Sequence, residues 1–113
     1  MKGLRGLQRL EMPCIVNVTD AGLANLEGLS ELRFLWLGYS GITDQGLIHL
    51  AHLTNLEELH VGVYKSQFKD AGLVHLSGLK NLKKLTLVRT GVTDAAIGEL
   101  KKALPRCTIE TRK

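Results

Sequence analysis

Apolar residues recur along this chain in two alternating patterns. The first has apolar residues at positions 1, 4 and 6 of a six-residue segment, and successive copies are offset by 25, 24, 26 and 22 residues. Since the last two apolar positions enclose an outward residue, each copy predicts a short strand with one buried face. The five copies are Leu7-x-x-Leu10-x-Met12, Leu32-x-x-Leu35-x-Leu37, Leu56-x-x-Leu59-x-Val61, Leu82-x-x-Leu85-x-Leu87 and Leu104-x-x-Cys107-x-Ile109.

The second pattern lies between the strand segments and predicts helices. Its four copies are Thr19–Leu23, Thr43–Leu47, Lys69–Leu73 and Thr93–Ile97. Apolar residues three apart follow each start, which places one apolar stripe on a helix. The Thr-Asp pair suits a helix N-terminus, and the sequence leaves open which of the two residues caps it. We expect that a side chain would hold the helix off its neighbouring repeat at the recurring first-turn glycines, Gly22, Gly46 and Gly72.

The two patterns keep step over essentially the whole chain, and together they carry a family resemblance. The L-x-x-L-x-L segments with a 22–26-residue period resemble the leucine-rich repeat family. The T-D-x-G-L helix start resembles the subtype abundant in bacterial repeat proteins, which is similar to the cysteine-containing repeats of F-box substrate receptors. The resemblance implies an α/β fold: a right-handed solenoid of about four repeats, with a parallel sheet on the concave face and helices on the convex face.

Composition indicates one domain, residues 1–113. The chain is 44% hydrophobic and 23% charged, which excludes disorder. No apolar run approaches the length of a membrane span, the start lacks a signal peptide, and two cysteines make no disulfide framework, so we expect a cytoplasmic protein. Met1–Leu4 aligns with the end of a helix, Leu26–Leu29. The chain is therefore expected to be either a fragment of a longer array without its N-terminal cap, or a module whose first strand is covered by something else.

Residues between the strand leucines point outward, onto the implied concave face. Phe34 and Trp36 are neighbours there, and aromatic residues and arginine dominate binding hot spots. Tyr39 and Arg89 are expected just beyond strand ends, and Tyr64 in the longer loop of the third repeat. The candidate partner-binding residues are Arg9, Phe34, Trp36, Tyr39, Glu58, His60, Tyr64, Lys84 and Arg89.

Two alternative readings of the outward aromatics stay open. Phe34 and Trp36 would have no binding role if they only packed on long neighbours such as Arg9 and Glu58. Alternatively, the predicted strand is placed one residue off, so that Phe34 and Trp36 do not point outward.

No catalytic arrangement is present in the sequence, since nucleophile elbow, phosphate loop and metal-ligand set are all missing. His49 and His52 lack a third ligand, so we expect no metal and no cofactor. No small-molecule substrate is evident. We therefore predict a non-enzymatic module that binds a protein or peptide on its concave strand face.

Three further functions compete with this prediction. The chain would be an assembly element if it self-associated through an uncapped N-terminal edge near Arg9–Met12, or the substrate-recognition part of a larger enzyme such as a ubiquitin ligase. Residues 80–113 carry nine basic and three acidic side chains of a chain with net charge +4. Nucleic-acid binding is nevertheless unlikely, because the basic residues spread over strand, loop and helix. They include Lys80, Lys83, Lys84, Arg89, Lys101 and Lys102.

Overall fold

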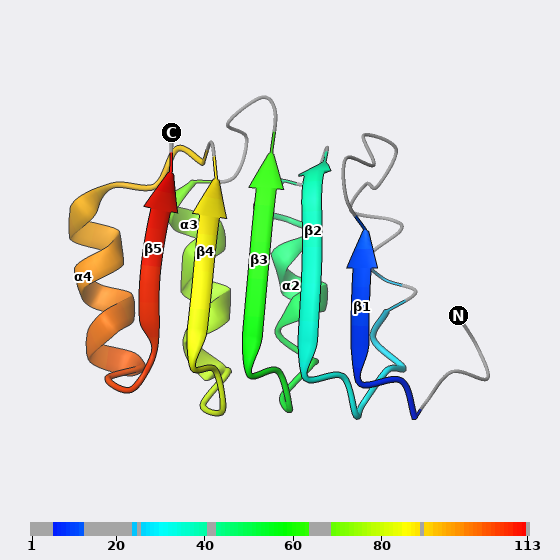
Figure 1. Ribbon diagram of the computed structural model, residues 1–113. Coiled ribbons are helices and arrows are strands. Elements are labelled where there is room, and N and C mark those ends of the chain that lie inside the picture. The colour runs from blue at the N-terminus through cyan, green and yellow to red at the C-terminus, as the bar shows by residue number, and fades with distance from the viewer. Residues whose placement is uncertain are drawn as a thin grey trace.

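One parallel sheet of five strands organises the chain (Figure 1). The computed structural model describes residues 6–12, 24, 26–40, 43–63, 69–88 and 90–112. Strand order follows chain order, so each strand pairs with the strands of the repeats before and after it. The bounds are β1 Arg9–Met12, β2 Phe34–Ser40, β3 Glu58–Val63, β4 Lys84–Val88 and β5 Thr108–Arg112. The prediction of an α/β fold with five parallel strands is confirmed.

Helical segments connect the strands; those between β2 and β4 lie behind the sheet in Figure 1, and the one between β4 and β5 lies beside β5 at the left end. They are α2 Leu47–Leu50, α3 Asp70–Leu73, the 3₁₀ helix η1 Val74–Gly78, and α4 Asp94–Ala103. α2 and α3 are shorter than the predicted helices. Leucines spaced by three, such as Leu73, Leu76 and Leu79, explain this difference, because a 3₁₀ helix with about three residues per turn keeps them on one side.

Leucines from the strands and helices form the core between the sheet and the helical layer. Leu35 and Leu37 of β2 are fully buried, and so are Leu59 and Leu85 at the same register position. The described core contains no aromatic side chain. Each leucine therefore packs mainly against leucines of adjacent repeats, as stacking of repeats requires.

Aspartates at the helix starts connect one repeat to the next. Asp44 Oδ1 accepts a hydrogen bond from Lys69 N at 2.6 Å. Asp70 accepts two from the following repeat, from Thr93 N and Thr93 Oγ1, both at 2.8 Å. Among the three described α-helices, a side-chain cap is present at α4, where Thr93 Oγ1 accepts from Ala96 N at 3.2 Å; α2 and α3 have none.

The repeating glycine at the third helical segment is required by close packing. A Cβ on Gly72 would lie 2.5 Å from Asp44 Oδ1 and 2.9 Å from Asp44 Cα. Both atoms belong to the preceding repeat. The expectation that a side chain here would hold the helix off its neighbour is therefore confirmed at this position.

The last strand corrects the predicted repeat register. Leu85 pairs with Ile109 and Leu87 with Thr111, whereas the sequence pattern aligned Leu87 with Ile109. Cys107 takes the position of Leu82, because its amide donates to Leu104 O just as Leu82 N donates to Leu79 O. The final repeat has one residue fewer between this turn and its strand. The spacing of apolar residues in the sequence therefore aligns this repeat incorrectly with the one before it.

This correction changes the role of the C-terminal residues. Cys107 is buried in the turn before β5, and burial raises the pKa of its thiol, although nearby Lys101 opposes the shift. Cys107 therefore serves as a small buried hydrophobe. Glu110 and Arg112 belong to β5.

Candidate partner-binding face of the sheet

The outward residues form two straight rows across the side of the sheet away from the helices. We call this side the front face. Leu35 and Leu37 between the outward residues are fully buried, so the strand register is not misplaced. The first row is Arg9, Phe34, Glu58, Lys84 and Thr108, and the second row is Glu11, Trp36, His60, Thr86 and Glu110. Arg112 lies on the same face two positions beyond Glu110.

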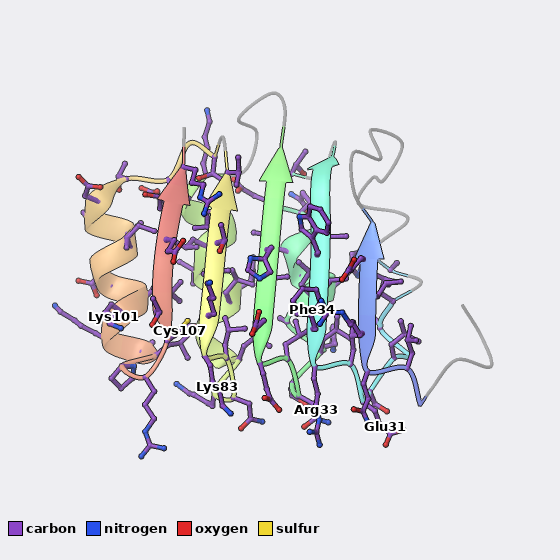
Figure 2. The ribbon with its side chains drawn as sticks, in the orientation of Figure 1. Glu31, Arg33, Phe34, Lys83, Lys101 and Cys107 are labelled. Atoms are coloured by element: carbon purple, nitrogen blue, oxygen red, sulfur yellow. The ribbon has the colours of Figure 1, made fainter. Side chains whose placement is uncertain are left out.

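Phe34 is held between side chains of both neighbouring strands (Figure 2). The Arg9 guanidinium carbon lies 3.8 Å from the centroid of its ring, which is a cation–π contact. Glu11 Oε1 fixes that guanidinium at 3.0 Å from Nε and 2.8 Å from Nη2. On the other side, the His60 ring lies 5.5 Å from Phe34 at 47°, and His60 Nε2 lies 3.3 Å from Glu58 Oε2. Phe34 therefore packs on Arg9, as one of the open alternatives expected.

Trp36 differs from Phe34 although it lies two residues further along the same strand. It sits between Glu11 and His60 in the second row and is 40% exposed. Within the described residues its ring has no aromatic or cation–π contact. Packing on neighbouring side chains thus explains the outward position of Phe34, but it does not explain the exposure of Trp36.

The remaining charges of the front face pair with one another. Glu110 lies 4.0 Å from Lys84 Nζ and 3.7 Å from Arg112 Nη2. These side chains are exposed, and such pairs contribute up to about 1 kcal/mol each. A partner can therefore replace these ion pairs with its own contacts at little cost in free energy. The β5 members of this face, Thr108, Glu110 and Arg112, do not follow from the sequence pattern, because the register of the last repeat differs from it.

The structure places the other candidates only in part. Tyr39 lies within β2 and not beyond its end: a bulge shifts the register after Leu37, so that Tyr39 pairs with Gly62. A bulge admits one extra residue and lengthens the strand past the repeat pattern. Tyr64 and Arg89 lie outside the described residues.

Several basic residues near the C-terminus contact carbonyl or carboxylate oxygens of the chain, at the end of the sheet where the strands begin. Lys80 Nζ donates to Ala103 O at 3.3 Å, at the end of α4, and Lys101 donates to Cys107 O (Figure 2). Cations at a helix C-terminus are favoured by its dipole. Lys83 pairs with Glu57 at 3.4 Å. The prediction that nucleic acid is an unlikely partner stays untested by these contacts.

On the helical side, His49 Nδ1 contacts Glu27 Oε2 of the preceding repeat. That hydrogen bond lowers the pKa of Glu27, with desolvation opposing the shift and the charges of His52 and His49 adding to it. Across the described ranges, no group of three His, Cys, Asp or Glu residues is placed to hold a metal. No described helix is long and apolar enough to cross a membrane.

Comparisons with known proteins place this architecture among repeat proteins. No model of a known protein family matches the sequence, and neither does any curated protein. The crystal structure of an internalin C2 from Listeria monocytogenes is similar, with a TM-score of 0.65 and 25% sequence identity. The match covers 95% of this chain and 42% of the internalin chain, so this chain spans less than half of that protein. Internalin C2 is a leucine-rich-repeat protein, and the likeness supports the leucine-rich-repeat fold in general.

Proposed function

We propose that this chain is a non-enzymatic module that binds a protein or peptide partner on its front face. In this proposal the repeats follow the T-D-x-G-L subtype and form a right-handed solenoid whose front face is concave. The general fold supports a recognition role, because leucine-rich repeats mostly serve protein binding. That support comes from the fold alone and says nothing about which residues bind.

Trp36 is the observation that carries the proposal. A tryptophan that is 40% exposed on an interior strand of the sheet, with charged side chains nearby, has the composition of an interface hot spot. Phe34 and His60 lie beside it, and the charged residues Arg9, Glu58 and Lys84 supply a polar rim. Tyr39, Tyr64 and Arg89 complete the proposed site on the grounds of sequence position.

A matched pair of variants tests this function. Trp36→Ala removes the exposed aromatic of the front face, and Ile48→Ala removes a side chain of similar exposure, 42%, on α2 at the helical side. Proteins captured from a lysate by the wild-type chain should be retained by Ile48→Ala and lost with Trp36→Ala. Equal capture by both variants, with unfolding curves confirming that both are folded, would refute binding at the front face.

Assembly through the N-terminal edge is the second candidate function. β1 is an outer strand of the sheet, and Leu7 and Leu10 are only partly buried, whereas their counterparts Leu32 and Leu35 are fully buried. A further strand, from a second copy, would complete their burial. Sedimentation velocity tests this idea, because a strict monomer at high concentration would exclude it.

A further inference from the structure

We propose that the partner presents a basic side chain, arginine or lysine, which stacks on the Trp36 indole and pairs with the carboxylates of Glu11 and Glu58. This inference rests on the proposed function and specifies the chemistry of its partner. Three observations support it. They are the positions of the side chains around Trp36, the carboxylate oxygens of Glu11 and Glu58 that accept no hydrogen bond from the described residues, and the similar contact between Arg9 and Phe34.

Two carboxylates flank Trp36 on opposite sides. Glu11 is its direct register partner on β1, and Glu58 lies on β3 beside Phe34, one row away. Adjacent strands are about 4.8 Å apart, so both carboxylates can reach a group seated on the indole. Their side chains are 44% and 45% exposed. A partner therefore reaches both acids without moving the sheet.

Each of these carboxylates contacts the described residues through one oxygen. Both Arg9 contacts go to Glu11 Oε1, and the His60 contact goes to Glu58 Oε2. Glu11 Oε2 and Glu58 Oε1 accept no hydrogen bond from the described part of the chain. Two acceptors beside an exposed aromatic ring thus remain for donors supplied by a partner.

The chain already contains one example of this recognition. Arg9 lies over the Phe34 ring at 3.8 Å while Glu11 binds the same guanidinium. That arrangement occupies Phe34, whereas the neighbouring Trp36 ring receives no cation–π contact from the described residues. Tryptophan is a better cation–π acceptor than phenylalanine, so an incoming cation finds the stronger ring unoccupied.

Charge selects a cation over the other side chains. Two described cations lie near these acids: Arg9 is held on Phe34 and Glu11, and Lys84, the register partner of Glu58, pairs with Glu110. An acidic side chain on the indole would meet two carboxylates, and an apolar one would cover their unused oxygens without replacing lost water contacts. A guanidinium or ammonium group satisfies both the ring and the acids.

Selection of peptides on the whole chain tests the inference. A random dodecapeptide phage library is panned on immobilised wild-type protein, and the clones are then compared on Trp36→Ala. We expect Trp36-dependent clones to share arginine or lysine at one position. The double variant Glu11→Gln/Glu58→Gln should bind them about tenfold more weakly, while Glu99→Gln, which removes an exposed carboxylate of α4 on the helical side, should bind them as wild type does.

The outcomes separate this inference from the function on which it rests. Trp36-dependent clones without a common basic position, or clones unaffected by the double glutamine variant, would overturn the basic partner and keep the binding face. Clones that bind Trp36→Ala as well as wild type, or a library with no enriched clones, would overturn the proposed function itself. Thermal unfolding of each variant shows that lost binding does not come from lost folding.

Discussion

The Arg9 guanidinium lies 3.8 Å from the centre of the Phe34 ring and is fixed there by Glu11. This contact makes two adjacent aromatics on one strand unequal. Phe34 belongs to a network that spans three strands, whereas Trp36 is exposed beside it. The front face therefore combines a fixed cluster of side chains around Phe34, which we call the platform, with the exposed ring of Trp36.

The two aromatics should respond differently to truncation. Phe34→Ala removes a half-buried ring and its contacts with Arg9 and His60, and should lower the free energy of unfolding by about 1–3 kcal/mol. Trp36→Ala should cost less, since its ring is 40% exposed and makes no ring contact with the described residues. Urea unfolding measures both. A larger loss for Trp36→Ala would contradict the platform.

Gly72→Ala should destabilise the stack of repeats. The new Cβ would lie 2.9 Å from the Cα of Asp44, so backbone must move, at a cost of about 1–3 kcal/mol. Gly98→Ala in α4 is the control, because a Cβ there meets no atom within 4 Å. It should stabilise the protein by about 0.5–1 kcal/mol through helix propensity. Thermal melts of the two variants should move in opposite directions, and parallel shifts would count against the packing argument.

Asp70 should contribute more to the free energy of unfolding than Asp94. Asp94 also begins a helix, but it makes no hydrogen bond to another repeat within the described part of the chain. Asp70→Ala leaves Thr93 N and Oγ1 without their acceptor, at a cost of about 1–3 kcal/mol. Asp94→Ala in the first turn of α4 removes only a favourable dipole interaction, about 0.3–1 kcal/mol. Chemical denaturation compares them. Equal losses would show that the link between repeats contributes nothing beyond the helix charge.

The contact between Glu27 and His49 should make stability depend on pH. Because the folded pKa of Glu27 lies below its ordinary value of 4.5, its contribution is fully present above that value and is lost as pH falls through the lowered pKa. Glu27→Gln removes the titrating group. The stability difference between wild type and this variant should therefore shrink as pH falls below 4.5. A difference that stays constant through that range would rule out the linkage.

Ion quenching should reveal a negative environment at Trp36, which is the only tryptophan of the chain. Charges more than about 10 Å away are screened at 0.1 M salt, so nearby Glu11 and Glu58 should outweigh the net charge of the protein. The ratio of caesium to iodide quenching should exceed that of free N-acetyltryptophanamide. Glu58→Gln should lower the ratio and Glu110→Gln should not. A ratio below the free amide would speak against a basic partner.

The sequence by itself determined the repeating architecture. Alternating apolar positions in each strand segment specify which side of the sheet is buried, since a shift of one residue would expose every leucine. Leu35 and Leu37 are therefore buried and Trp36 is outward, as predicted. The glycine in the first helical turn of the third repeat also follows from the pattern, and the structure shows at Gly72 the close approach that requires it.

Tertiary structure decided what the repeat pattern leaves open. The register of β5, the bulge that brings Tyr39 into β2, and the use of Asp70 as a link between repeats all depend on pairing with residues about one repeat away. The difference between Phe34 and Trp36 has the same origin. Both occupy equivalent outward positions in the sequence, and only the side chains of adjacent strands make one of them part of the scaffold and leave the other exposed, because contacts across strands follow from spatial neighbours and not from local periodicity.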